Sequence, residues 1–446
     1  MNNFPEEFSP SLELEAKKSI NKKNGHIKNG RGAATMWLYH AAAGDRLVRL
    51  KTEALYLYIY DPEIPERYMY TYSYDEEENW TTFRKCFKLP KEYTFTKECY
   101  FRIEVRRLAV SSKKAIDEAG SLVQLIRRET PVYAWMKEYD KVYGEELEAV
   151  KKRAAAVAGR GPSFVLMSDS HVAVGGTWPC TVMTVGDITR TLSADKSFKG
   201  IIHLGDLTDG LLPRKMSEAY ISHYMNDLKD QGTPLMFLAG NHDYNYFKGN
   251  PDYFKKADIE RLYGVQNRCI DYEEGLRLIM LESFDPVKKP RYGFDENTLD
   301  FLEKELAHTP KGYAVLVLAH IPPVRRLHFW GKIRGEKRLL KLLRLYARSG
   351  RGPLIGYIHG HNHGELIDGN ESFPIIGVGC GKCESFEGKK PAGSRVYERR
   401  VGTVSQEMWD VLTVDLQKRQ LIFTRFGAGD DKIVDCTTGS VEYISH

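Results

Sequence analysis

The sequence predicts a layered α/β protein preceded by a smaller all-β region. Three observations predict this fold class. Between about Ala33 and Leu108, aromatic and β-branched residues recur at every second position, which is the period of a strand. From Ser163 onward, short apolar runs alternate with amphipathic helical stretches, as in βαβ units. Polar motifs that contain Asp, Asn or His end five of those apolar runs.

The first part of the chain, residues 1–108, is expected to form a small sandwich-like domain. Residues 1–32 are polar and rich in Gly, Asn and Lys, so we expect them to begin as a loose arm. Two tyrosine series at period two follow, within residues 56–60 and residues 68–74. These tyrosines would form either an aromatic platform for a glycan or protein partner, or an ordinary sandwich face whose hydroxyls reach solvent or neighbours.

Residues 109–160 are expected to be a helical connector. Two stretches, residues 115–128 and residues 139–157, carry apolar residues at spacings of three and four, and Pro131 separates them. Glycines and a proline at residues 159–162 then indicate a domain boundary.

Residues 161–446 are expected to be one α/β domain. Its clearest helical stretches lie between the apolar runs and include residues 182–196, 218–232, 296–309 and 336–350. The segment from Met408 to Gly429 has alternating apolar residues and predicts a hairpin that closes a sheet edge.

Bulk composition excludes several classes of protein. The chain of 446 residues is 42% hydrophobic and 28% charged, with a formal charge of +5, so no nucleic-acid footprint is expected. We find no window apolar enough to span a membrane and no signal-peptide pattern, so a cytoplasmic location is expected. Seven sparse cysteines favour free thiols, and the single CxxC of Cys380 and Cys383 is interpreted as two structural thiols.

Five short motifs end apolar runs, in the order DSH, GD, GNHD, AH and GHNH. Parallel strands bring their carboxyl ends to one edge of a sheet, so these side chains are expected to converge there. Carboxylate and amide oxygens mixed with imidazoles, without a thiolate, suit Mn, Fe or Zn. We therefore expect a metal-dependent hydrolase whose ligands are Asp169, His171, Asp206, Asn241, His320, His361 and His363.

With all five motifs present in order, residues 163 to about 430 resemble the calcineurin-like metallophosphoesterase superfamily. The resemblance implies a β-sandwich flanked by helices and two divalent metal ions that share Asp206. By motif position, Asp169, His171 and His363 would complete the first metal site. Asn241, His320 and His361 would complete the second. The implied reaction is in-line attack on phosphorus by a hydroxide that bridges the two metals.

The resemblance also implies that His242 faces the scissile phosphate without binding metal. It would protonate the leaving group or stabilise the developing charge, with Asp243 or Asp206 fixing its environment. The residues of the motifs are more similar to those of the phosphodiesterase and broad phosphoesterase branches than to those of the phosphoprotein phosphatases. A small-molecule phosphodiester or phosphomonoester is therefore the expected substrate.

Loops that follow the strands are expected to choose the substrate. Trp178 lies in the segment after the first motif, and Arg325, Arg326 and His328 follow His320. The second segment, residues 325–330, combines cations with aromatic surface, which would suit a phosphate that carries a ring or a sugar, although an ordinary surface loop is an equally good interpretation. Two other hypotheses stay open: a glycan- or surface-targeted phosphoesterase, and a non-catalytic scaffold on the same fold.

Overall fold

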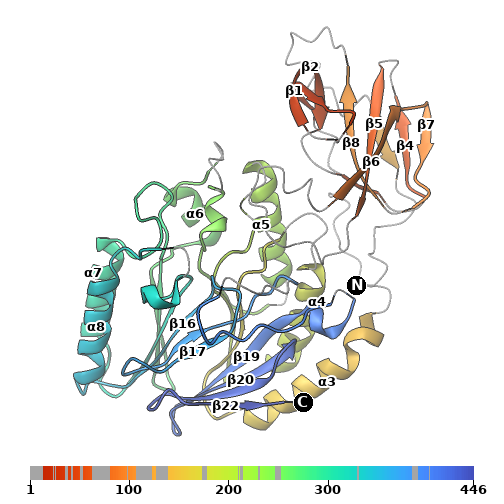
Figure 1. Ribbon diagram of the computed structural model, residues 1–446. Helices are drawn as coiled ribbons and strands as arrows, with labels where there is room; N and C mark the ends of the chain where they lie inside the picture. The colour runs from red at the N-terminus through yellow and green to blue at the C-terminus, as the bar shows by residue number, and fades with distance from the viewer. Residues whose placement is uncertain are drawn as a thin grey trace. The chain divides into compact units, whose positions relative to one another are not determined.

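The structure, a computed structural model, divides into two compact units, Met1–Glu138 and Tyr139–His446. The residues it describes are 14–23, 25, 27–35, 39–41, 44–50, 54–62, 81–97, 99–106, 123–126, 139–172, 178–208, 210, 214–229, 232–246, 253–328, 331–383, 390–400 and 402–445. Within them, the first unit is built of strands and the second combines sheets with helices (Figure 1). This confirms the predicted fold class.

The first unit contains two antiparallel sheets. One has the order β1-β2-β8-β5-β6, with β3 also paired to β8, and the other has the order β7-β4-β9. The strands are β1 (Leu14–Ile20), β2 (Ile27–Thr35), β3 (Tyr39–Ala41), β4 (Arg46–Arg49), β5 (Leu55–Pro62), β6 (Thr81–Lys88), β7 (Glu92–Thr94), β8 (Cys99–Val105) and β9 (Val123–Ile126). Leu47 and Val123 from the smaller sheet join one buried cluster with Leu57, Phe101 and Ile103 from the larger one.

Two of the three tyrosines of β5, Tyr58 and Tyr60, are buried, whereas Tyr56 is partly exposed. Tyr58 donates its hydroxyl to Glu104 Oε2 (2.5 Å) and Tyr60 donates to the carbonyl of Gly25 (2.6 Å). Leu57 and Ile59, on the opposite face of the strand, are buried too. Tyr58 and Tyr60 therefore act as packed residues with satisfied hydroxyls. The second tyrosine series, residues 68–74, lies outside the described residues.

Two local expectations for this unit were wrong. The predicted loose arm contains β1 and most of β2, which pair antiparallel along their length. The first predicted connector helix, residues 115–128, contains strand β9, which pairs with β4. A short apolar run does not by itself distinguish a strand from a helix, and here the pairing with β4 decides. The second predicted helix is confirmed as α3 (Tyr139–Val157).

The second unit contains two larger sheets, each with a parallel portion. One has the order β12-β11-β10-β19-β20-β21-β22, in which β10, β11 and β12 are parallel. The other has the order β13-β14-β15-β16-β18-β17, in which β14, β15, β16 and β18 are parallel. The predicted hairpin near the end of the chain is β19 and β20, which pair antiparallel.

The strands of this unit are β10 (Ser163–Met167), β11 (Phe198–His203), β12 (Leu235–Phe237), β13 (Arg268–Tyr272), β14 (Leu276–Leu281), β15 (Ala314–Ala319), β16 (Leu354–His359), β17 (Leu366–Asp368), β18 (Ile375–Gly377), β19 (Met408–Asp415), β20 (Gln420–Gly427), β21 (Asp431–Asp435) and β22 (Val441–Ile444). Besides α3, the helices are α4 (Trp178–Leu192), α5 (Arg214–Lys229), α6 (Lys256–Tyr263), α7 (Glu296–Ala307) and α8 (Glu336–Arg348), and short 3-10 turns are η5 (His242–Tyr244), η7 (Arg325–Leu327) and η8 (Val404–Gln406).

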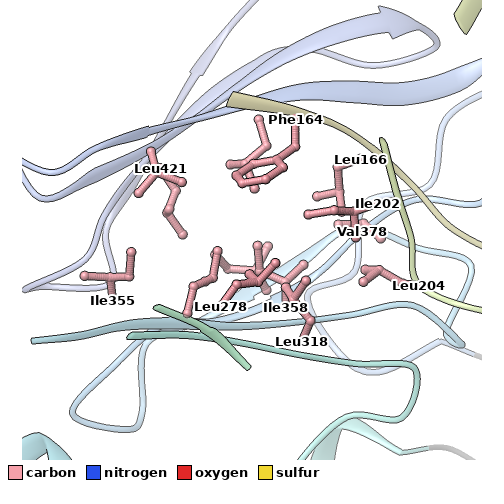
Figure 2. Close-up of a cluster of buried hydrophobic side chains, with 14 of the residues drawn as sticks. Phe164, Leu166, Ile202, Leu204, Leu278, Leu318, Ile355, Ile358, Val378 and Leu421 are labelled. Carbon is pink, nitrogen blue, oxygen red and sulfur yellow. The ribbon is translucent and has the colours of Figure 1, made fainter. Parts of the chain in front are cut away.

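The hydrophobic core lies between the two large sheets. Figure 2 shows Phe164 and Ile202 from one sheet facing Leu278 and Ile358 from the other. Alternate residues of β14 and β15 point away from this layer into a second cluster formed with α7 and α8. Burial of each such leucine or isoleucine side chain stabilises the folded state by about 1.5–3 kcal/mol. The two sheets are thus fixed face to face, and their strand ends are held at defined positions.

Helices cover the outer faces of this sandwich. In Figure 1, α7 and α8 lie outside the sheet that contains β16 and β17, and α3 lies beside β20 of the other sheet. The four predicted helical stretches coincide with α4, α5, α7 and α8. None of the helices in the described part of the chain combines the length and the apolar character needed to cross a bilayer.

Candidate metal centre

Each motif follows the carboxyl end of a parallel strand. Asp169 lies two residues after β10, Asp206 three residues after β11, Asn241 four residues after β12, His320 directly after β15 and His361 two residues after β16. Both sheets contribute, so their carboxyl ends meet at one edge of the sandwich. This is the edge at which open α/β sheets bind ligands.

Five of these motif residues adopt a left-handed backbone conformation. The φ angles are 53° at Asp169, 43° at His171, 53° at Asp206, 69° at His361 and 52° at His363. Among the described residues, the other non-glycine residues with positive φ are Asn245 and Arg419. Residues other than glycine rarely adopt this backbone conformation, and such backbone strain is concentrated at functional sites.

Glycines allow the strand ends to approach one another. A Cβ at Gly240 would lie 2.2 Å from Asp206 Oδ1, and a Cβ at Gly360 would lie 2.5 Å from Asp169 Oδ2. A side chain at either position would therefore displace a carboxylate of the site. These contacts explain the glycine that precedes Asn241 and the one that precedes His361.

The first group of converging side chains consists of Asp169, His171, Asp206 and His363. Their potential ligand atoms all lie within 4.8 Å of one another. His363 Nε2 lies 3.2 Å from Asp169 Oδ1 and 2.9 Å from His171 Nε2, and His171 Nε2 lies 3.8 Å from Asp206 Oδ2. Two carboxylates and two imidazoles are thus aimed at one point, which is the donor set expected for a borderline divalent cation.

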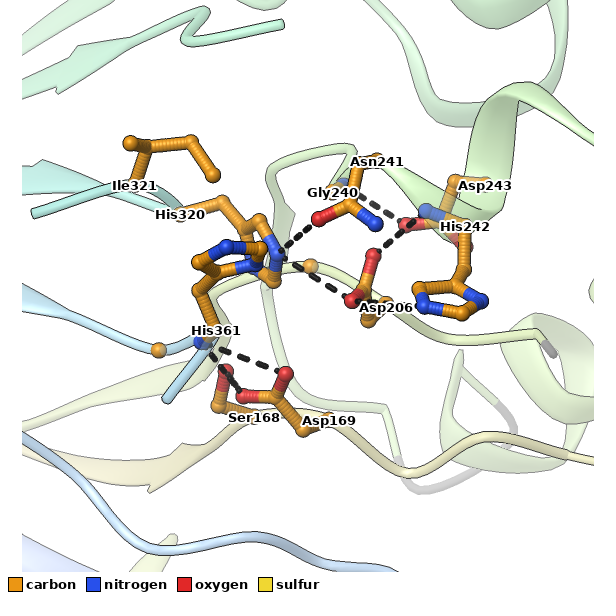
Figure 3. A network of polar contacts seen from close by, with 12 residues as sticks. Ser168, Asp169, Asp206, Gly240, Asn241, His242, Asp243, His320, Ile321 and His361 are labelled. Atoms are coloured by element: carbon orange, nitrogen blue, oxygen red, sulfur yellow. Dashed lines mark hydrogen bonds and ion pairs between the residues drawn. The ribbon is translucent and has the colours of Figure 1, made fainter. Parts of the chain in front are cut away.

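The second group consists of Asp206, His320 and His361, again within 4.8 Å. His320 Nε2 lies 3.2 Å from Asp206 Oδ2 and 3.2 Å from Asn241 Oδ1, so the Asn241 carbonyl oxygen joins this group (Figure 3). His320 Nδ1 lies 3.1 Å from the carbonyl oxygen of Leu204. Because a carbonyl only accepts, Nδ1 carries the proton and Nε2 is the atom that can ligate. Asp206 belongs to both groups.

Charges within the site perturb one another. Burial tends to raise the pKa of Asp206, but His320, His242 and His171 lower it to about 2. Burial tends to lower the pKa of His320, but Asp206 and then Asp169 and Asp243 raise it to about 9. His363, His320 and His171 likewise hold the pKa of Asp169 well below its ordinary value despite burial. The buried edge therefore carries anionic carboxylates that attract positive charge.

His242 lies beside the first group without being a member of it. Its backbone N–H donates to Asp206 Oδ1 (2.7 Å), its Nε2 lies 4.0 Å from Asp206 Oδ2, and its ring centroid is 4.7 Å from that of His171. Its side chain is 18% exposed, whereas those of Asp169, Asp206 and His320 are at most 1% exposed. His242 can therefore meet a ligand that approaches from solvent.

Asp243 supports the turn that carries these residues. Its carboxylate accepts from the N–H of Gly240 (2.7 Å), the N–H of Thr208 (3.1 Å) and the hydroxyl of Tyr263 (2.9 Å). Burial and the neighbouring Asp206 raise its pKa to about 6. These three hydrogen bonds anchor the turn that carries Asn241 and His242.

The residues predicted to contact substrate do not gather in the same way. Arg326 donates to Asp368 (2.7 Å), and its guanidinium is held there on the surface. Trp178 is buried against Tyr220 and Tyr224 at the start of α4. The backbone N–H of Arg325 donates to Glu336, and its side chain is exposed. Only His328 reaches the centre, where its ring stacks on that of His361 at 5.2 Å and 16°.

Sequence reasoning missed several residues around the centre. Ser168 donates to Asp169 (2.5 Å), and Tyr292 packs its ring 5.3 Å from that of His361. Cys380, one of the two CxxC cysteines, donates its thiol to the carbonyl of Asp169 (3.2 Å). It therefore supports the backbone of this candidate ligand. Ser168 could have been noticed because it directly precedes the first motif. Tyr292 lies in a loop without any periodic signal.

The second unit combines an α/β sandwich with two groups of Asp and His side chains that share one carboxylate. This combination defines a class of proteins with a candidate divalent-metal centre. Residues 162–365 match the family model described as calcineurin-like phosphoesterase. This part of the chain is thus similar to that family. The family and the site together support a metal-dependent phosphoesterase. Among curated proteins, none matches the chain.

Several solved structures match parts of this chain at low similarity. One is titled GAP50, the anchor in the inner membrane complex of Plasmodium, with 14% identity and a TM-score of 0.39, covering 64% of this chain and 88% of that chain. Another is TT1561 of Thermus thermophilus, with 10% identity, a TM-score of 0.32, and 64% and 99% covered. The phosphopantetheinyl hydrolase of Mycobacterium tuberculosis has 13% identity, a TM-score of 0.33, and 50% and 91% covered.

Proposed function

We propose that this chain is a dinuclear metal-dependent hydrolase of small-molecule phosphoesters. The observation that carries the proposal is the shared carboxylate of Asp206, which belongs to both groups of converging ligand atoms. A carboxylate shared by both groups would hold two cations close together, as two-metal hydrolysis needs. Asp169, His171 and His363 would complete one cation site, and Asn241, His320 and His361 the other.

The donor set fits divalent Mn, Fe or Zn. It offers carboxylate and amide oxygens with imidazole nitrogens, and the nearby thiol of Cys380 is turned to the carbonyl of Asp169. When bound, two such cations would lower the pKa of a shared water and neutralise charge on the phosphoryl oxygens. The left-handed backbone at five of the positions indicates that the fold has been constrained to aim these side chains inward.

His242 is the residue that we assign to the reacting phosphate. It is partly exposed and adjoins both Asp206 and His171. A protonated His242 can donate to the oxygen of the leaving alkoxide or stabilise charge on the phosphoryl group, and such general acid catalysis contributes about 10²–10⁴-fold. Asp243, through its bonds to Gly240 and Thr208, keeps the turn that carries His242 in place.

The test combines metal content with hydrolysis. The full chain would be analysed for Mn, Fe and Zn by elemental analysis and assayed with bis-p-nitrophenyl phosphate and p-nitrophenyl phosphate. We expect two metals per chain and hydrolysis of at least one substrate. Asp206→Asn should lose both metal and activity, whereas Asp140→Asn, at an exposed position of α3, should lose neither.

Two outcomes would contradict the proposal. Absence of bound metal and of activity under every metal addition would favour a non-catalytic scaffold on the same fold. Activity that survives Asp206→Asn with full metal content would mean that the shared carboxylate is not essential. A glycan-targeted variant of the proposal gains nothing from Tyr58 and Tyr60, since both side chains are buried.

A further inference from the structure

A cluster of aromatic side chains adjoins the second group of ligands. The ring of Tyr292 lies 5.3 Å from that of His361 and 4.8 Å from that of His328, and His328 stacks on His361. His328 is held in turn by a contact of 3.0 Å between its Nδ1 and the carbonyl of Gly331. Tyr292 itself is partly exposed. Its ring thus packs against a candidate metal ligand, and the residue as a whole stays partly exposed.

Tyr246 extends the same surface. The hydroxyls of Tyr246 and Tyr292 are 3.1 Å apart, and both rings pack on the buried Phe284, at 4.8 and 5.4 Å. The guanidinium of Arg291 lies over the ring of Tyr246 at 5.2 Å. Tyr246 is partly exposed and Arg291 is exposed. Two tyrosine rings, two hydroxyls and one cation therefore occur together, and we call Tyr246, Tyr292 and Arg291 the tyrosine surface.

Electrostatics indicates that this surface is close to the ligands. Burial raises the pKa of Tyr246 well above its ordinary value, Tyr292 and Asp206 raise it further, and Arg291 lowers it. The phenol is therefore protonated at neutral pH, and the charge of Asp206 is one of the influences that keep it so. Its neutral hydroxyl can act as a hydrogen-bond donor to an anionic substrate.

The tyrosine surface and His242 adjoin different ends of the ligand cluster. His242 adjoins His171 of the first group, whereas Tyr292 adjoins His361 of the second. Figure 3 shows His361 and His242 on opposite sides of Asp206. If His242 serves the leaving alkoxide, the tyrosine surface is placed to receive a different substituent of the phosphorus. A phosphomonoester has a single ester substituent, whereas a phosphodiester has two.

We propose that the tyrosine surface binds a planar ring on the substituent that remains attached to phosphorus, so that the substrate class is a ring-bearing phosphodiester. The proposal rests on the function proposed above and deepens it. Water adds to phosphorus, the bond from phosphorus to the leaving oxygen breaks, and that oxygen takes up a proton. The products are an alcohol and a ring-bearing phosphomonoester. Aromatic faces and an arginine recognise planar rings by stacking and cation–π contact.

The experiment compares two diesters that share a leaving group. Bis-p-nitrophenyl phosphate and methyl p-nitrophenyl phosphate both release p-nitrophenolate, and only the first retains a ring on phosphorus. In Tyr292→Leu we expect kcat/KM to fall about tenfold for the ring-bearing diester and to stay within twofold for the methyl diester. Tyr246→Leu should act in the same direction. Tyr292→Phe, which keeps the ring, should retain most of the preference.

Controls separate this effect from damage to the fold or to the metal centre. Tyr313→Leu alters a partly buried tyrosine at the amino end of β15, away from the ligand edge, and should change neither substrate. Metal content should be unchanged in every variant. A binding measurement that needs no turnover complements the rates: by calorimetry, phenylphosphonate should bind wild type about tenfold more tightly than methylphosphonate, and Tyr292→Leu should abolish the difference.

The outcomes distinguish this proposal from the proposed function. Equal loss for both diesters in Tyr292→Leu, or no loss for either, would overturn the ring subsite while hydrolysis by wild type upholds the phosphoesterase. Phosphonate affinities that do not differ in wild type would also overturn it. A wild-type protein that holds no metal and hydrolyses neither diester would overturn the proposed function, and the ring subsite with it.

Discussion

Glu407 is a buried carboxyl group that should make the stability of the second unit depend on pH. It lies directly before β19 and is fully shielded from solvent. Thr181 donates to one carboxyl oxygen (2.6 Å) and Gln406 donates to the other (3.1 Å), and neither partner is charged. Burial raises the pKa of Glu407 from 4.5 to about 7, against the lowering effect of these two hydrogen bonds and of the Arg399 charge.

The size and sign of the effect follow from this pKa. In the unfolded chain Glu407 releases its proton near 4.5, whereas in the folded chain it keeps the proton up to about pH 7. The folded state binds more protons in this interval, so stability falls as the pH rises from about 4.5 to about 7. Each pKa unit corresponds to about 1.4 kcal/mol, so the ionised group destabilises the fold by roughly 3 kcal/mol above that interval.

The perturbation that isolates this group is Glu407→Gln. The amide keeps the shape of the protonated acid, and the Thr181 hydroxyl can turn to accept from it. The free energy of unfolding of both proteins would be measured in urea from pH 4.5 to 8.5. We expect equal stability at the acid end and an advantage of roughly 3 kcal/mol for the variant at pH 8. Comparing the two proteins at each pH cancels the other titrating groups.

A difference between the two proteins that does not vary with pH would refute this reasoning. So would a variant that is less stable than wild type at pH 8, because the neutral hydrogen bonds would then outweigh the charge. Arg399, whose charge acts on Glu407, donates to the carbonyl of Cys380 (2.8 Å), and Cys380 donates to the carbonyl of Asp169 (3.2 Å). Arg399 and Cys380 thus link the titrating carboxyl to Asp169 of the candidate metal centre.

Two further predictions concern the site and its support. His242→Ala should keep both metals by elemental analysis and lose about 10²–10⁴-fold in turnover of diesters with poor leaving groups, with a small loss for p-nitrophenolate; equal losses for all leaving groups would argue against an acid. Arg425→Met leaves the buried Glu365 and Asp410 with only one of their two cations and should destabilise by about 3–5 kcal/mol in urea unfolding, whereas Arg400→Met, at an exposed position, should change little.

The second unit could be predicted well because its local and long-range signals agree. Each apolar run, such as that of β15, is buried on both faces of a parallel strand, so it is continuous in the sequence and ends abruptly at a polar residue such as His320. The amphipathic pattern of α8 likewise matches its buried face of Leu339, Leu340 and Leu343. The convergence of the five motifs at one edge could be predicted from the direction of the parallel strands alone.

The first unit could be predicted less well because pairing overrides its local composition. β1 contains Lys17 and Lys18 and lies at an edge of its sheet, and its polar sequence resembles a solvated arm. Leu125 and Ile126 fit a helical spacing, yet they lie in β9 because β4 offers them a partner. Tyr292 shows the same limitation in the second unit, since only the folded loop brings it beside His361.

The backbone conformation of the ligands is the property that the sequence conceals most completely. Gly240 and Gly360 mark close approach before Asn241 and His361, but no such residue marks the left-handed conformation of Asp169 or His171. At roughly 1 kcal/mol for each of the five left-handed positions, the strain is a substantial fraction of the stability of a domain. Such strain is concentrated at functional sites, and these five positions are among those that we propose as metal ligands.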